Sequence, residues 1–198
     1  MANTKNHTPL VRYLATESYL MTRGAALHFP AKQFSKLITP EHSVYGVVID
    51  IPMNPTTLAT LVVYINGAAN LYFNMYDGEH MGCYTGASQR YQSVVQAGQI
   101  LVTNASRMLG DAQKTKQFDL PMGRNNNIFL LTRNGIYKKT VSPTEVANES
   151  KEVQSVYFLY QRVMQELHSA QMKDRAAAQK NPVSYTHLRA HETGRNLV

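Results

Sequence analysis

Residues 44–73 read VYGVVIDIPMNPTTLATLVVYINGAANLYF, and this stretch specifies the central part of a β-sheet. Val44–Pro52 and Thr57–Ile65 predict two strands, because β-branched residues favour extended backbone. The two prolines that follow the first run predict a turn, since proline cannot donate to a strand ladder. Asn66-Gly67 predicts a type I′ turn that pairs the second strand with a third, Ala68–Phe73. The stretch therefore predicts a three-stranded antiparallel unit.

The second of these strands is apolar on both faces. One face carries Leu58, Val62 and Tyr64, and the other carries Ala59, Leu61, Val63 and Ile65. A strand of this kind is covered on both sides in known folds. We therefore expect helices, or a partner chain, against each face of the sheet.

Three helices are expected around the sheet. The first covers Thr8–Leu27, with Thr8 as its N-cap. The second follows Ser88, its predicted N-cap, and repeats apolar residues every three or four positions. It carries Gly98 on its inner face, where the missing side chain lets the helix approach the sheet closely. The third covers about residues 144–178 and is also amphipathic.

A second hairpin is predicted around Asn134-Gly135, which separates two β-rich runs. Lys138 and Lys139 are adjacent and so lie on opposite faces of their strand, a pattern that suits a sheet edge. The expected fold class is α+β: an antiparallel five-stranded sheet with long amphipathic helices packed on it. Its order is helix, three strands, helix, two strands, helix.

The chain divides into three expected parts: an N-terminal helical segment (1–40), an α+β domain (41–181) and a tail (182–198). Residues 183–193 read VSYTHLRAHET, which is similar to the translation of a transposase-type sequencing adapter, and Asn196–Val198 match its continuation. We expect this tail to be non-native, with the natural sequence interrupted near Asn181. The histidines of the tail, His187 and His191, therefore carry no functional weight as metal ligands.

Composition restricts the class of protein. The 198 residues are 43% hydrophobic and 17% charged, which is too apolar for a disordered chain and too polar for a membrane protein. The N-terminal residues lack the continuous apolar core of a signal peptide. The single cysteine, Cys83, excludes an intrachain disulfide and suits a reducing compartment. We expect a soluble cytoplasmic protein with no membrane partner.

The order of elements over roughly Val44–Ala170 resembles the profilin-like group of folds, which includes roadblock and longin domains. This resemblance implies a sheet that serves as a platform for dimerisation or adaptor contacts. Three segments also resemble a set of bacterial proteins with no established activity: VYGVVIDIPM (44–53), GAANLYF (67–73) and FLLTRNGIY (129–137). The second resemblance implies a bacterial origin.

The segment 74–90, before the second helix, is the candidate ligand site. Its glycines and the free N–H groups of a helix N-terminus favour a small anion or a nucleotide. The residues assigned to such a site are His80, Gly82, Gly86, Ser88 and Arg90. The alternative is an ordinary loop, because the spacing matches neither a Walker motif nor a dinucleotide fingerprint.

No coherent catalytic set is recognisable in the sequence. His80 and Cys83 supply at most two ligands to a metal ion, and the others would have to come from distant positions. The same two residues lie close together in a loop, a poor geometry for a nucleophile and its base. No metal, cofactor or catalytic residue is assigned, and the question of enzymatic activity stays open.

Nucleic acid is one alternative partner. The formal net charge is +7 and the pI is about 9.5. Six basic residues are candidates to gather near one end of the sheet: Lys114, Lys116, Arg124, Arg133, Lys138 and Lys139. No basic run exceeds two residues, and net charge by itself says little about a specific partner.

The leading hypothesis is a non-catalytic adaptor or regulatory module that binds a protein partner or a second copy of itself. The residues assigned to its contact surface are Tyr157, Tyr160 and Met164 on the last helix, with Tyr72 and Tyr76 near the third strand. The alternative places the helix residues in the intrachain core. The rival hypothesis is a small-ligand or nucleotide sensor, or an enzyme, that uses the segment 74–90.

Overall fold

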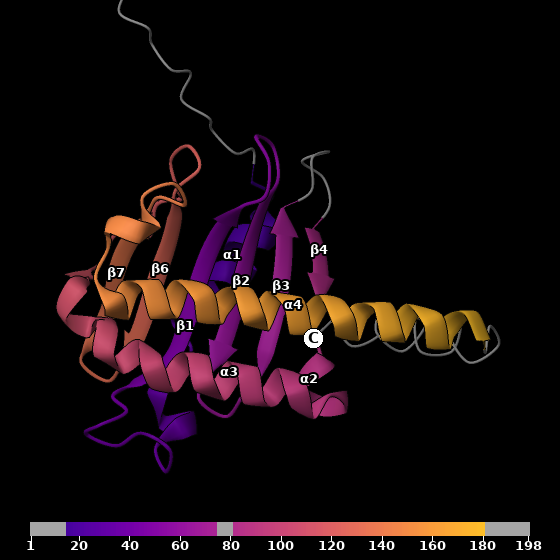
Figure 1. Cartoon of the computed structure of the whole chain (residues 1–198), viewed down its shortest axis with the longest axis horizontal. Coiled ribbons are helices and arrows are strands. Elements are labelled where there is room, and N and C mark those ends of the chain that lie inside the picture. The colour runs from indigo at the N-terminus through magenta and orange to yellow at the C-terminus, as the bar shows by residue number, and fades with distance from the viewer. Residues whose placement is uncertain (1–14, 75–80, 181–198) are drawn as a thin grey trace, which may run out of the picture.

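The computed structural model describes residues 15–74 and 81–180 (Figure 1). Within these residues the helices are α1 (Glu17–Leu27), α2 (Ala87–Arg90), α3 (Gln92–Ala105) and α4 (Lys151–Lys180). The strands are β1 (Val44–Pro52), β2 (Leu58–Tyr64), β3 (Ala69–Asn74), β4 (Met81–Tyr84), β5 (Gln113–Thr115), β6 (Asn126–Thr132) and β7 (Gly135–Val141). Three 3-10 helices lie between them, η1 (Ala31–Phe34), η2 (Ser106–Asp111) and η3 (Val146–Asn148).

The strands form one antiparallel sheet in the order β4-β3-β2-β1-β6-β7-β5. The predicted three-stranded unit is confirmed, with Val47 opposite Val63 and Leu61 opposite Leu71. Strand β1 lies at the centre and joins this unit to the second hairpin through β6, where Val48 is opposite Phe129. The expected α+β class with an antiparallel sheet and helices is therefore correct.

Helices cover the sheet on both faces, as predicted from the apolar residues on both faces of the second strand. In Figure 1, α3 and α4 lie side by side across the near face, and α1 lies behind the sheet. The Tyr19 hydroxyl of α1 contacts Thr60 on one face of β2, whereas Gly98 of α3 packs against Val63 on the other. Every residue of β2 is buried in consequence.

The expected number of five strands is wrong, because the described residues contain seven. Strand β4 lies in the segment predicted to be a loop, and β5 lies in a polar connector. Both are short edge strands held by backbone pairing, β4 with β3 and β5 with β7. Short edge strands need no apolar alternation, so their sequences carry no strand signal. Because β5 covers β7, the lysine pair does not mark the sheet edge.

The turn between β2 and β3 differs from the predicted type I′ geometry. Gly67 has a φ of +85°, but no described non-glycine residue has a positive φ, so Asn66 does not adopt the required conformation. The Gly67 N–H donates to the Tyr64 carbonyl (2.8 Å), and the Asn66 side chain accepts from the Ala68 N–H (3.1 Å). This is a type I turn followed by a left-handed glycine.

Helix α3 approaches the sheet at two glycines, which confirms the role predicted for Gly98. A Cβ added at Gly98 would lie 3.0 Å from Val63 Cγ1 and 3.2 Å from the Gly67 carbonyl oxygen. A Cβ added at Gly67 would lie 2.5 Å from Val95 Cγ1. The helix therefore rests directly on the β2–β3 turn.

Hydrogen bonds at the N-termini of two helices differ from those predicted. Helix α1 begins at Glu17, where Thr16 Oγ1 accepts from the Tyr19 N–H (3.2 Å); the expected cap at Thr8 lies outside the described residues. Ser88 does not cap a long helix, because its hydroxyl accepts from the Ala69 N–H of β3 (2.9 Å). The expected long helix is broken at Tyr91, whose backbone is extended, into α2 and α3.

A buried ion pair holds α1 against the sheet. The Arg23 guanidinium donates to both carboxylate oxygens of Asp50 on β1, at 2.9 and 2.6 Å, and to the Phe118 carbonyl oxygen at 2.8 Å. Thr60 on β2 donates to the same carboxylate at 2.8 Å. Asp50 is fully buried and Arg23 nearly so. The two-pronged geometry satisfies the buried charges and fixes the position of the helix.

Candidate functional site

An apolar groove of about 490 Å³ lies between α4 and the β3–β4 end of the sheet. We call it the α4 groove. Its floor is formed by Leu71 and Phe73 of β3. Met164 and Leu167 of α4 form one wall, and Met53, which follows β1, lies at one end. These side chains come from three separate parts of the chain that the fold brings together.

The groove exists because the helices do not cover the whole near face of the sheet. In Figure 1, α3 and α4 lie next to each other, and the strand ends on the side of the β1–β2 hairpin extend past α4. Phe73 and Leu71 point to the same face as Leu61, which the helices bury, but only Leu61 is fully covered. The strip beyond α4 is therefore apolar sheet surface beside a helix.

The rim of the groove is polar and its interior is not. Gln165, His168, Ser169 and Gln171 of α4 line its outer part. Tyr84 of β4 also lines it, but the Tyr84 hydroxyl donates to Asp174 (2.7 Å), so only the ring offers surface to the groove. An apolar cleft with a few polar groups at its border is typical of a binding surface for an apolar or amphipathic group.

The Asp174 cluster, formed by Tyr84, Arg90, Tyr91 and Asp174, closes one end of this region. Arg90 Nη2 donates to Asp174 Oδ2 at 2.7 Å, and the Tyr91 hydroxyl donates to Oδ1 at 2.6 Å. The Tyr84 hydroxyl donates to Oδ2. One carboxylate of α4 thus receives hydrogen bonds from β4, from α2 and from the residue before α3. The cluster holds the last third of α4 in place.

The cluster shifts the pKa values of its members. Partial burial would raise the pKa of Asp174, but hydrogen bonds from Arg90, Tyr91 and Tyr84 outweigh it and hold that pKa below the ordinary 3.8. Burial, together with the hydrogen bond to Asp174, raises the pKa of Tyr84 to about 12. The charged carboxylate is therefore the form that the fold stabilises.

Replacing Asp174 by asparagine is expected to lower the free energy of unfolding by about 1–2 kcal/mol, because charge-assisted hydrogen bonds are lost while half-exposed Arg90 limits the effect. The depressed pKa means that the carboxylate stabilises the fold above pH 3.8 and that this contribution is lost as the pH falls below it. Urea unfolding at pH 7 and pH 3 measures both effects. Wild type should lose more stability than Asp174→Asn over this range, and equal losses would contradict the assignment.

The residues predicted for a ligand site lie close together, but their polar groups have partners within the chain. Gly82 pairs with Phe73 in the sheet, and Gly86 (φ +73°) precedes the four-residue helix α2. Ser88 accepts from Ala69, and Arg90 pairs with Asp174. His80 lies outside the described residues. An anion at this position would have to compete with Asp174 for Arg90.

The residues predicted for a contact surface are separated by the fold. Tyr157 and Tyr160 belong to the core, with 8% and 3% of their surface exposed, and the Tyr160 hydroxyl accepts from Asn126 (2.6 Å). They offer little surface to a partner while α4 stays packed. Met164 lines the α4 groove, whereas half-buried Tyr72 is opposite Cys83 on the β3–β4 pair. Tyr76 lies outside the described residues.

Four of the six predicted basic residues line one polar pocket at the β5–β7 edge: Lys114, Lys116, Lys138 and Lys139. Arg133 lies in the β6–β7 turn and donates to the Ser35 carbonyl oxygen (3.1 Å). Arg124 does not line the pocket. The expected gathering of positive charge is therefore partly present, on β7, on β5 and at the residue that follows β5.

Residues 15–74 and 81–180 contain no group of three or more His, Cys, Asp or Glu side chains placed to hold a metal ion. No helix in the same ranges is long and apolar enough to cross a membrane. No family model, curated protein or solved structure matches the chain. Function is therefore inferred from the geometry and charge of the surfaces described above.

Proposed function

We propose that the protein is an interaction module that holds an amphipathic helix of a partner polypeptide in the α4 groove. The observation that carries the proposal is the apolar cleft lined by half-buried Phe73 and Met164 and by exposed Met53, bordered by polar side chains of α4. Apolar surface gathered in a cleft with a polar rim is uncommon on a protein with no partner.

A helix suits this groove better than an extended segment. The floor is the face of β3, whose backbone groups already pair with β2 and β4. An added strand needs free backbone donors and acceptors, which occur at a sheet edge and not on a sheet face. A helix that packs on a sheet requires only complementary apolar side chains, as α3 and α4 already provide beside the groove. The partner helix would extend the same helical layer.

The charge around the groove favours a partner with an acidic polar face. Without Arg189, Glu192 and Arg195 of the tail, the chain still carries a formal charge of +6. Arg175 lies four residues after Gln171 on α4, so the two share one side of the helix, and among the described residues no carboxylate pairs with Arg175. Asp174, its neighbour, is already neutralised by Arg90. A glutamate-rich helix would complement this end of the groove.

A synthetic peptide can test the proposal directly. The probe is a fluorescent helical peptide of about 16 residues with leucines at positions i, i+3, i+4 and i+7 and glutamates on its other face. Met164→Asp should weaken its binding at least tenfold, since a charge would face the apolar floor. Met53→Asp, at an exposed position beside the groove, should act in the same direction. Fluorescence anisotropy measures both.

Two controls define the outcomes. Met122→Asp changes a methionine that is 63% exposed but does not line the groove, and it should leave binding unchanged. A peptide of the same composition in scrambled order should bind at least tenfold more weakly. Equal binding of both peptides, or unchanged binding by Met164→Asp, would contradict the proposal. A dimer in sedimentation that Met164→Asp dissociates would show that a second copy, not another polypeptide, occupies the groove.

A further inference from the structure

We propose that the outer edge of β4 pairs with an extended segment of the partner polypeptide whose helix lies in the α4 groove. The inference rests on the proposed function, because one partner supplies both the helix and the strand. Strand β4 ends the sheet on this side, and the groove is lined by Phe73 of β3 and Tyr84 of β4. The partner would therefore extend the sheet and the helical layer at the same side of the molecule.

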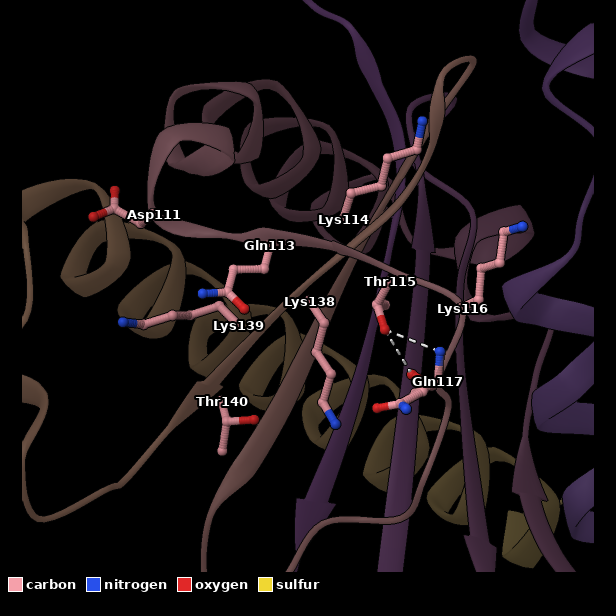
Figure 2. A pocket seen from close by; sticks show the side chains of 9 residues that line it. All are labelled: Asp111, Gln113, Lys114, Thr115, Lys116, Gln117, Lys138, Lys139 and Thr140. Carbon is pink, nitrogen blue, oxygen red and sulfur yellow. Dashed lines mark hydrogen bonds between the residues drawn. The ribbon is translucent and has the colours of Figure 1, made fainter.

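The two edges of the sheet differ in their protection against an added strand. Strand β5, at the other edge, contains Lys114, and Lys116 follows it directly. Figure 2 shows both lysine side chains extending away from Lys138 of the neighbouring strand. Lysines on an edge strand oppose pairing with another chain. The four residues of β4, MGCY, contain neither a charge nor a proline, so this edge lacks such protection.

The backbone of β4 is paired on one side. Its inner side pairs with β3, where Gly82 is opposite Phe73 and Cys83 is opposite Tyr72. In an antiparallel sheet, successive residues direct their N–H and C=O groups to the two sides of the strand alternately. No described residue forms a backbone hydrogen bond with the outer side of β4. The outward groups are the donors and acceptors that strand addition requires.

Helix α4 extends past this edge of the sheet, as Figure 1 shows. Asp174 accepts from Tyr84, the last residue of β4, and residues 175–180 continue beyond the strand. Ala178 lies one helical turn after Asp174, on the same side of α4, and is half-buried. A strand added to β4 would continue the sheet under this turn, where the small alanine leaves room for a bulky apolar side chain.

The two faces of the added strand would meet different surroundings. The Cys83 side chain lies on the α1 face of the sheet, which Tyr72 and Thr60 share, and it is exposed. Side chains of the added strand next to Cys83 would stay in contact with water, whereas those on the other face would lie under α4. Because successive side chains of a strand point to opposite faces, the partner segment should alternate apolar and polar residues.

A second copy of the chain fits this edge less well. Antiparallel pairing of two β4 strands about a twofold axis would place the ends of both α4 helices on one face of the joined sheet. Each end carries Lys173 and Arg175, and no carboxylate pairs with either residue among those that the structure describes. Repulsion between these like charges opposes self-pairing.

Extended versions of the fluorescent helical peptide test the inference. A run of about five residues that alternates valine and threonine is added at one end of the helix or at the other. One of the two extended peptides should bind at least tenfold more tightly than the helix alone, because the second contact forms within the complex. N-methyl groups at odd or at even positions of the run are the controls. Only the set whose N–H groups face β4 should remove the gain.

The single thiol of the chain, Cys83, reports the pairing directly. Peptides with one cysteine at successive positions of the run, oxidised with glutathione disulfide, should cross-link to Cys83 at alternate positions, because only these share its face. The matched control combines Cys83→Ser with Gln113→Cys, which moves the thiol to an exposed position on β5. It should cross-link no more than a peptide without the helix does. Thermal unfolding checks that the control is folded.

The outcomes separate this inference from the proposed function. Binding of the helix alone, with no gain from either extension, would overturn the strand pairing and leave the helix site in place. No binding by any of the peptides would overturn both. Cross-links at every position would show a flexible contact in place of a paired strand and would also overturn the inference. A dimer in sedimentation that the extended peptide does not dissociate would make a second copy the occupant of this edge.

Discussion

Replacing Asp50 by alanine is expected to destabilise the protein by about 3–5 kcal/mol, because the change leaves the Arg23 guanidinium buried without its counter-charge. The Thr60 hydroxyl would also lose its acceptor. Helix α1 contacts the sheet through this pair, through the Tyr19–Thr60 and Tyr64–Ala26 hydrogen bonds, and through apolar residues around them. We therefore expect loss of α1 packing together with a lower midpoint in urea unfolding monitored by circular dichroism.

A double variant separates the charge effect from simple loss of packing. Arg23→Met with Asp50→Leu removes both charges and keeps apolar volume, so it should recover most of the stability that Asp50→Ala loses. Glu152→Ala, at an exposed position on α4, is the surface control and should change stability by less than about 0.5 kcal/mol. A double variant as unstable as Asp50→Ala would mean that the pair itself is needed for stability.

Replacing Gly67 by alanine is expected to destabilise the protein by about 2–4 kcal/mol. Two causes add: the residue has a φ of +85°, and the new Cβ would lie 2.5 Å from Val95 Cγ1 and 2.7 Å from the Val95 carbonyl oxygen. Because the second atom belongs to the backbone of α3, the helix must move away from the β2–β3 turn. Chemical denaturation of the purified variant measures the change.

Gly123→Ala is the matched control for this prediction. Gly123 also has a positive φ (+62°), but a Cβ added there would meet nothing within 4 Å. Gly123→Ala therefore has the cost of a positive φ without a steric clash, and we expect it to lower the free energy of unfolding by about 1 kcal/mol. Similar losses at both positions would show that α3 adjusts easily and that the close contact at Gly67 contributes little.

Much of the fold was predictable from local sequence. The β-branched runs predicted β1 and β2 within one residue at each end, and the two-sided pattern of β2 predicted cover on both faces. Gly98 predicted the close approach of α3 because a glycine on the inner face of an amphipathic helix has a packing reason. These features depend on the periodicity of apolar residues and on side-chain size, both of which can be read from a short stretch of sequence.

The candidate surfaces were only partly predictable. Met164 was found because it lies on the inner side of an amphipathic helix, but nothing in the sequence showed that Phe73 would stay half-buried beside it. The Asp174 cluster was missed for a similar reason. Arg90 and Asp174 are 84 positions apart, and in the sequence Asp174 is one charge among several near the end of α4.

The sequence by itself determined which segments are extended, which are helical, and which of their faces are apolar and need to be buried. These properties follow from the backbone preferences and the spacing of neighbouring residues. Only the tertiary structure decided that β4 and β5 complete the sheet, that Lys139 pairs with Glu149, and that α4 leaves a groove beside it. Such features depend on contacts between distant segments. The free energy that stabilises them comes from strand pairing and side-chain packing between residues that are far apart in the sequence.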